Sequence, residues 1–387
     1  MKIDISKYLA RKSYSTSFIP EIDGLRFLAI ITVVLFHLQT YYFRTIDTGF
    51  EFEGIAKSIH YLISKGGLGV NVFFGISGFI LALPFAKRYF NNQKIELKSY
   101  FIRRLTRLEP PFIISLVLLL IAQILYFHTS FQELQSHFIA SLFYVHFIVF
   151  GTWSTINPVT WSLETEVQFY IIAPLLFLIF KHANFIVRHL YFVGLIVASI
   201  LSTFFFKAWL IEHHLHKSLI VYLPYFILGA LFAEYYILYI HNKVKNKSYV
   251  WDLLGLTATV GLFIFHDNSN DLFKFLQLTF LFIVFISTFK GTILNWFYTR
   301  KIIYTIGGMC YSIYLIHYAL IAFLVKYSVK IYFLDGYLGN MFTQIVIVIP
   351  IILIVSAIFF ALFEKPFMYK DWPKKFIHFF TPKTTIK

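Results

Sequence analysis

Long apolar runs separated by short polar segments recur along the whole chain. A helix that crosses a bilayer needs about 20 predominantly apolar residues. Ten runs approach that length, at residues 25–43, 67–86, 110–128, 164–181, 189–207, 218–240, 250–266, 272–289, 302–325 and 342–363. The shorter apolar stretch 137–151, with His137 and His146, fits an interfacial or re-entrant segment better. The pattern predicts an all-α, polytopic integral membrane protein with about ten transmembrane helices.

Composition supports this class of protein. Hydrophobic residues make up 58% of the chain and charged residues 14%, whereas a soluble domain carries about 25% charged residues. Cys310 is the one cysteine, which excludes an intrachain disulfide. The first apolar run lacks a small-residue cleavage site, so we expect it to stay as a signal anchor. We expect a single transmembrane domain over 1–387, with short cytoplasmic tails at about 1–24 and 364–387 and no appended soluble domain.

The positive charge is unevenly distributed. The net charge is +15, and loop 87–109 carries seven Lys and Arg residues, whereas segment 129–163 carries none. Because Lys and Arg accumulate on the cytoplasmic side of membrane proteins, both termini are expected in the cytoplasm. The excess of positive charge therefore indicates how the chain is oriented in the membrane lipids. It does not indicate a nucleic-acid partner, because no soluble basic domain is present to hold one.

The first apolar run carries two ionisable residues, Arg26 and His37. They are eleven residues apart, which is about three helical turns, so they share one face about 16 Å apart along the axis. Ionisable groups inside a membrane are expensive and mark functional sites. The alternatives are a snorkelling interface anchor for Arg26 and an interhelical hydrogen bond for His37. The shared face favours the functional interpretation.

Two further segments carry polar groups that suit a ligand. The glycine-rich segment 65–84 places Asn71 and Ser77 inside a span; close helix packing explains most of its glycines, and exposed backbone amides facing a polar ligand are the alternative. In SYFIRRLTRLEPP, Arg104 and Arg107 are neighbours on one helix face. That pair is either a topogenic cluster at the lipid headgroups or a clamp for phosphates.

The segment NPVTWSLETEVQFYIIAP, residues 157–174, carries a membrane carboxylate. Ser162, Glu166 and Tyr170 recur at every fourth residue and so share one helix face, whereas Glu164 points away. A carboxylate flanked by hydroxyls suits a general base or a proton relay. A helix-capping cluster is the alternative, and it explains Glu164 better than Glu166.

Two weaker features involve histidine. YSIYLIHYAL places His317 inside the ninth predicted span. The cluster HHLH at 213–216 has no nearby acid or cysteine to complete a metal site, so we interpret it as a solvated loop and expect no metal.

In combination, these motifs resemble acyltransferase family 3. The resemblance runs from PEIDGLR to the EKPF sequence at 364–367. It rests on five motifs in order, which are Arg26 and His37 with ten residues between them, GVNVFFGISGF, Arg104-Leu-Thr-Arg107, WSLETEVQFY and YSIYLIH. One position departs from the pattern: many members have Asp where this chain has Asn71, which puts in doubt any role that needs a carboxylate there.

The resemblance implies a membrane O-acyltransferase of the bacterial inner membrane. It implies transfer of an acyl group, commonly acetyl, from cytoplasmic acyl-CoA to a hydroxyl of an envelope glycan or glycolipid, such as lipopolysaccharide, capsule or exopolysaccharide. Acyl-CoA is then a substrate, and no tightly bound cofactor is expected. His37 would accept the acyl group or deprotonate the acceptor, Glu166 would act on the acceptor near the outer face, and Arg104 and Arg107 would hold the coenzyme A phosphates.

The remaining polar residues, Arg26, Asn71, Ser77, Ser162, Tyr170 and His317, are expected to line the substrate sites. A proton-coupled transporter or flippase is the alternative function, because it also uses intramembrane His and Glu residues. Against it, the chain shows no pair of similarly placed broken helices.

Overall fold

A computed structural model of the chain describes residues 18–46, 52–90, 96–240, 247–266, 271–331, 333–368 and 372. The expected tails therefore lie largely outside the described residues. Within the described ranges all regular secondary structure is helical, and no strand is present. The all-α prediction is confirmed.

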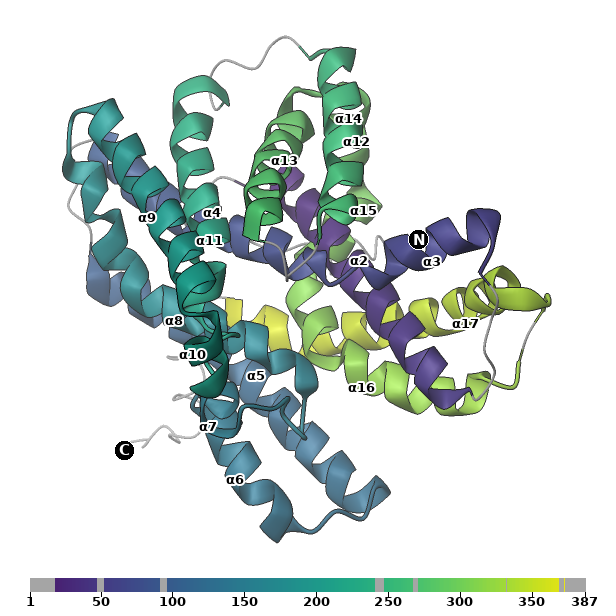
Figure 1. The fold of residues 1–387 in the computed structure, drawn as a ribbon. Coiled ribbons are helices and arrows are strands. Elements are labelled where there is room, and N and C mark those ends of the chain that lie inside the picture. The colour runs from purple at the N-terminus through teal and green to yellow at the C-terminus, as the bar shows by residue number, and fades with distance from the viewer. Residues whose placement is uncertain are drawn as a thin grey trace, which may run out of the picture.

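The helices succeed one another along the chain with short connections (Figure 1). Their bounds are α2 Pro20–Thr45, α3 Gly54–Ser64, α4 Leu68–Phe90, α5 Leu97–Tyr126, α6 Phe131–Leu142, α7 His146–Phe150, η1 Pro158–Thr160, α8 Trp161–Leu176, η2 Phe177–Lys181, α9 Phe185–Phe205, α10 Lys207–Glu212, α11 Leu219–Tyr235, η3 Tyr236–Ile240, α12 Tyr249–Ile264, α13 Asp271–Lys290, α14 Ile293–Tyr298, α15 Lys301–Gly308, α16 Cys310–Ser328, α17 Gly336–Phe359, η4 Phe360–Glu364 and η5 Lys365–Met368.

Within the described residues, eight helical stretches are long and apolar enough to cross a membrane. They are Leu68–Phe90, Leu97–Tyr126, Pro158–Lys181, Phe185–Phe205, Leu219–Ile240, Phe273–Lys290, Cys310–Ser328 and Gly336–Met368. The protein is therefore a polytopic membrane protein, and each stretch matches one of the ten predicted spans.

The other two predicted spans fall outside this group. The run 250–266 forms α12, whose 16 residues extend only about 24 Å at 1.5 Å per residue, less than the roughly 30 Å of a bilayer core. The run 25–43 forms α2, which has 26 residues and is long enough by the same measure. It carries Glu21 and Asp23 in its first turn and Arg44 in its last. The shorter stretch 137–151 forms α6 and α7, which have 12 and five residues.

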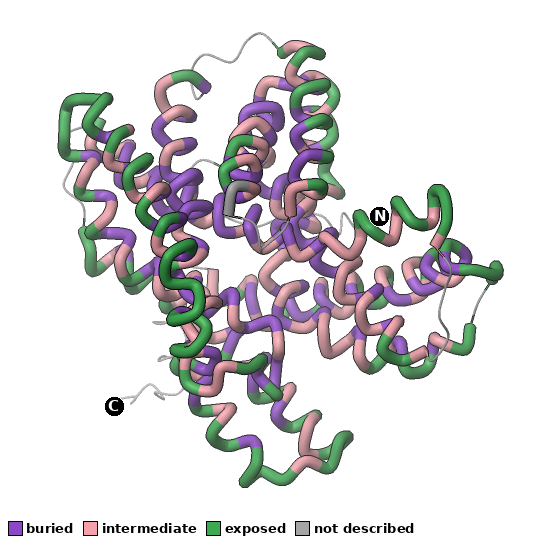
Figure 2. Tube along the Cα trace, in the orientation of Figure 1, coloured by how far each residue is buried: buried purple, intermediate pink, exposed green. Residues whose placement is uncertain are grey.

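Helices α4 and α11 lie side by side at the centre of the molecule and are its most buried spans (Figures 1 and 2). Glycines let their backbones approach closely, because a Cβ atom at Gly78 would lie 1.9 Å from the Phe226 carbonyl oxygen and one at Gly229 would lie 2.0 Å from that of Gly75. The packing interpretation of these small residues is confirmed. Helices α5, α9 and α17 are the least buried spans.

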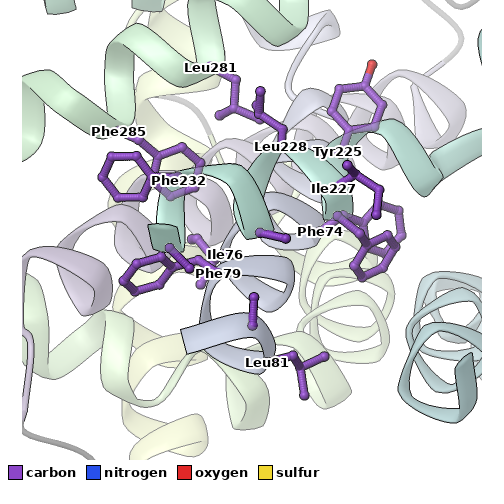
Figure 3. Close-up of a cluster of buried hydrophobic side chains, with 14 of the residues drawn as sticks. Phe74, Ile76, Phe79, Leu81, Tyr225, Ile227, Leu228, Phe232, Leu281 and Phe285 are labelled. Atoms are coloured by element: carbon purple, nitrogen blue, oxygen red, sulfur yellow. The ribbon is translucent and has the colours of Figure 1, made fainter. Parts of the chain in front are cut away.

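Aromatic and aliphatic side chains fill the space between α4, α11 and α13 (Figure 3). Phe74 and Phe79 of α4 meet Phe226 and Phe232 of α11, with ring centroids 4.7 and 5.4 Å apart. A second cluster joins α2, α16 and α17, and a third lies between α5, α8 and α16.

Candidate active site

Glu166 lies in the middle of the stretch Pro158–Lys181 and is held by two hydroxyl groups. Ser77 of α4 and Tyr170, one turn further along α8, both donate hydrogen bonds to its Oε1 atom. The shared face predicted for Glu166 and Tyr170 is therefore present. The contact with Ser77 adds a residue from a motif 89 positions away in sequence.

Arg104 of α5 joins this group through Tyr170. Its Cζ atom lies 5.5 Å from the centroid of the Tyr170 ring, and its charge acts on Glu166. The Tyr100 hydroxyl, one turn before Arg104, donates to the Tyr170 carbonyl at 3.1 Å and ties α5 to α8. Arg107 lies half-buried on the same helix. We call Ser77, Arg104, Glu166 and Tyr170 the carboxylate centre.

This arrangement corrects one expectation. The sequence placed Glu166 near the outer face, away from the arginines, whereas Arg104 and Glu166 share one centre. The physical reason is the depth of each residue in its helix. Arg104 is already seven residues into α5, about 10 Å along the axis, and its long side chain adds further reach.

Ser162 lies on the same face of α8, near the N-terminal end of the helix. Its Oγ atom lies 3.1 Å from the hydroxyl of Tyr314 on α16, and Tyr314 donates to the Val159 carbonyl at 2.6 Å. Tyr314 also lies within electrostatic reach of Glu166. Helix α16 thereby closes over the face of α8 that carries the carboxylate.

His37 and His317 are neighbours, with ring centroids 5.3 Å apart. Tyr318 also contacts His37, at 5.2 Å between ring centroids. The Nδ1 atom of His317 lies 2.9 Å from the Tyr314 carbonyl. Because a carbonyl only accepts, Nδ1 carries the proton, and Nε2 of the neutral ring is an acceptor. That Nε2 atom is buried and has no hydrogen-bond partner among the described residues.

The two groups are connected through Tyr314. Its ring lies 6.5 Å from that of His317, and its hydroxyl reaches Ser162. A line of polar side chains therefore runs from His37 to the face of α8 that bears Glu166.

Two predicted site residues lie elsewhere. Arg26 forms an ion pair with Asp23 on its own helix, with its side chain 11% exposed. Asn71 is buried, and its Nδ2 atom donates to Gln277 Oε1 at 3.4 Å; the Tyr225 hydroxyl donates to the same oxygen. Neither contact joins the carboxylate centre.

The sequence interpretation missed a second carboxylate at this site. Glu109 forms a side-chain hydrogen bond with Tyr144, which lies in the turn between α6 and α7. Burial, followed by the charge of Glu109, raises the pKa of Tyr144, so its hydroxyl stays protonated. Tyr311, one turn before Tyr314, donates to the Leu108 carbonyl at 2.9 Å. The signals were present in the quoted motifs, as an acid directly before the apolar run 110–128 and two tyrosines three residues apart.

In the described part of the chain, no group of three or more His, Cys, Asp or Glu residues could hold a metal ion. In the HHLH segment, His213 stacks on Trp209 with ring centroids 4.4 Å apart. The site is thus built from a carboxylate, hydroxyl groups, an arginine and a pair of histidines.

A carboxylate, hydroxyl groups, an arginine and two histidines thus meet between membrane-spanning helices. The protein belongs to the class of polytopic membrane proteins with a polar site inside the helical bundle. The profile of the family described as "Acyltransferase domain" matches residues 19–361. The chain belongs to this acyltransferase family.

The chain is also similar to curated proteins. With the O-acetyltransferase OatA of Staphylococcus aureus (strain NCTC 8325 / PS 47) it shares 29% identity over 347 residues, which cover 82% of this chain and 53% of that protein. With a putative O-acetyltransferase of Staphylococcus aureus (strain COL) it shares 26% identity over 363 residues, which cover 85% of this chain and 56% of that protein. The chain thus spans about half the length of these relatives. No solved structure matches it.

Proposed function

We propose that this protein is an O-acyltransferase of the bacterial inner membrane. It transfers an acyl group, in our proposal acetyl, from cytoplasmic acyl-CoA to a hydroxyl of a cell-surface polysaccharide or glycolipid. The family and the names of the relatives support the reaction class. The observation that carries the proposal is the carboxylate centre, where three helices bring an acid, two hydroxyls and an arginine together.

We assign binding of the acyl donor, acyl-CoA, to Arg104 and Arg107. Coenzyme A carries several phosphates, and guanidinium groups bind phosphate through paired hydrogen bonds. Arg104 contacts the Tyr170 ring in the carboxylate centre and makes no hydrogen bond among the described residues, so its N–H donors are available for an anion. Arg107 lies three residues further along α5, on the side of the membrane that the distribution of Lys and Arg assigns to the cytoplasm.

We assign activation of the acceptor hydroxyl to Glu166. The acceptor oxygen attacks the thioester carbonyl, the C–S bond breaks, an ester C–O bond forms, and coenzyme A leaves as a thiolate that takes up a proton. The hydroxyl proton passes to a base, which Glu166 supplies when it is ionised. Ser77 and Tyr170 orient its carboxylate by donating to Oε1.

We assign a direct role in acyl transfer to His37. As a neutral imidazole it acts either as a base or as a nucleophile that carries the acyl group between donor and acceptor. His317 and Tyr318 fix the position of its ring.

The test uses the purified full chain in lipid nanodiscs with radiolabelled acetyl-CoA. We expect His37→Ala to abolish transfer to an envelope glycan while the protein remains folded. Label on the wild-type protein before acceptor is added indicates the acyl-histidine route, and its absence indicates direct transfer. A folded His37→Ala protein with full activity would overturn the assignment. Mass spectrometry of envelope glycans from cells with and without the protein identifies the acceptor by its added mass.

A further inference from the structure

A lysine surrounded by aromatic rings lies beside the carboxylate centre. The Nζ atom of Lys217 lies 4.8 Å from the ring centroid of Trp161, 5.4 Å from that of Trp153 and 6.0 Å from that of Tyr222. The rings also touch one another, with centroids 5.9 Å apart for Trp153 and Trp161 and 5.3 Å apart for Trp161 and Tyr222. We call these four residues the lysine cage.

The ammonium of this cage has spare bonding capacity. Its one hydrogen bond in the described structure goes to the Tyr222 hydroxyl at 3.3 Å, although an ammonium has three donors. Among the described residues, no carboxylate lies within ion-pair distance of Lys217. Burial lowers the pKa of Lys217, as expected for a cation without a counterion.

The cage and the carboxylate centre share helix α8, and α4 packs against both. On α4, Phe74 contacts Trp161 and Tyr222, with ring centroids 6.5 and 5.2 Å apart, and Ser77 one turn later bonds to Glu166. On α8, Trp161 precedes Glu166 by five residues, about 7.5 Å along the axis. Phe74 and Ser77 share one face of α4, so the cage and Glu166 border the same part of that helix.

The cage is fixed in place and open on one side. Thr165 of α8 donates to the Lys217 carbonyl at 2.7 Å, and Gln168 accepts from the Leu219 amide at 2.9 Å, so the loop before α11 is bound to α8. Trp153 is 48% exposed. It belongs to segment 129–163, which lacks Lys and Arg and is predicted to lie outside the cytoplasm.

We infer that the lysine cage binds an acidic sugar of the acceptor glycan and holds the adjoining hydroxyl at Glu166. This inference rests on the proposed function. Indole rings offer flat apolar faces with a polar N–H group, which suit the C–H face of a sugar ring. An ammonium with unused donors and no counterion binds a carboxylate. A lipid-headgroup anchor would hold its ammonium in the water at the interface, whereas three rings surround Lys217.

Calorimetric titration of the full chain in nanodiscs tests this site with two probes that share one sugar backbone, one charged and one neutral. The probes are tetragalacturonate and its neutral methyl ester. We expect the wild type to bind the acid about tenfold more tightly, which is the effect of one charged hydrogen bond. Lys217→Met should remove that preference and leave binding of the ester unchanged. Trp153→Ala, at an exposed position that tolerates truncation, should weaken both probes by several-fold.

Lys207→Met is the matched control, because Lys207 is an exposed lysine of α10 in the same connection between spans. It should bind both probes like the wild type. Equal binding of acid and ester by the wild type, or no binding of either, overturns the inference. So does a Lys217→Met effect on retention of phosphatidylglycerol with none on the sugars, which would identify a lipid site.

Failure of the cage and failure of the proposed function give different results. If tetragalacturonate binds through Lys217 but the chain acylates no glycan, the sugar site stands and the acyltransferase proposal fails. If transfer occurs and Lys217→Met leaves the acceptor KM unchanged, the acyltransferase proposal stands and the sugar site fails.

Discussion

Two carboxylates within the helices, Glu166 on α8 and Glu234 on α11, each lie near an arginine but have different partners. Glu234 forms an ion pair with Arg188 of α9, whose Nε atom donates to Glu234 Oε1 at 2.9 Å. Arg188 also donates through Nη1 to the carbonyls of His182 and Ala183, at 2.6 and 2.9 Å. At Glu166 the hydrogen bonds come from hydroxyls, and Arg104 contacts a ring instead of the acid.

The comparison separates a structural acid from a candidate catalytic one. The donors of Arg188 are committed to fixed partners that hold α9 against α11, and neither Arg188 nor Glu234 is more than 3% exposed. Glu166 and Arg104 are only half-buried. Burial of a charge is therefore a poor guide to function, and the partners of that charge are the better one.

Glu166→Gln should give the largest effect on activity. The substitution keeps the shape and removes the proton acceptor, so we expect acyl transfer to fall about a thousandfold, or about 4 kcal/mol in the barrier. The measurement is a transfer assay paired with acyl-CoA binding, which should change little. Glu164→Gln is the matched control, since Glu164 accepts from the Phe147 amide, outside the carboxylate centre. Equal losses of acyl transfer in the two variants would contradict a special catalytic role of Glu166.

Arg188→Met should give the largest effect on stability. It leaves Glu234 buried without its cation, and breaking such a pair costs about 3 kcal/mol or more. We expect a lower unfolding temperature in nanodiscs and normal specific activity of the folded fraction. Glu166→Gln, measured in parallel, should unfold close to the wild type. A folded Arg188→Met protein that fails to transfer acyl groups would place the Arg188–Glu234 pair in the reaction.

The relation between Glu166 and Tyr170 followed from the sequence, because helical periodicity alone places residues four apart on one face. The same rule applied to Asp23 and Arg26, three apart, yet their ion pair was not anticipated. Periodicity gives no information on which helices meet. The contacts of Ser77 with Glu166 and of Tyr314 with Ser162 join segments 89 and 152 residues apart, and packing of α4 and α16 against α8 decides them.

The number of spans was limited by a different cause. An apolar run shows where a helix can form, but its length decides whether that helix can cross a bilayer. Ser248 accepts a hydrogen bond from the Val250 amide and starts α12 there. That start lies one residue before the apolar run 250–266, which as a helix is itself only about 26 Å long and so shorter than the bilayer core.

Arg104→Met tests whether the carboxylate centre binds acyl-CoA. We expect an effect of intermediate size. Loss of one guanidinium should weaken acyl-CoA binding about tenfold, consistent with one charge-assisted contact to phosphate. Binding by the wild type should also weaken as salt is raised, and the variant should show a shallower dependence. Arg103→Met is the control, because Arg103 is exposed and adjacent in sequence. Equal effects of the two substitutions would favour a diffuse topogenic cluster.

Asn71→Asp should have the smallest effect and places a new carboxylate inside the bundle. Asn71 donates to Gln277, which also accepts from Tyr225, and the new acid would face that same amide oxygen. Two acceptors cannot bond to each other, so we expect a loss of about 1 kcal/mol in stability.

Acyl transfer by Asn71→Asp should change less than tenfold, because Asn71 lies six residues, nearly two turns, before Ser77 on α4. Asn71→Ser, which removes the amide without adding charge, is the control for the transfer assay. A change in rate as large as that of Glu166→Gln, absent in Asn71→Ser, would mean that a carboxylate at this position reaches the reacting groups. Position 71 would then belong with Glu166, and the Gln277 network would be part of the site.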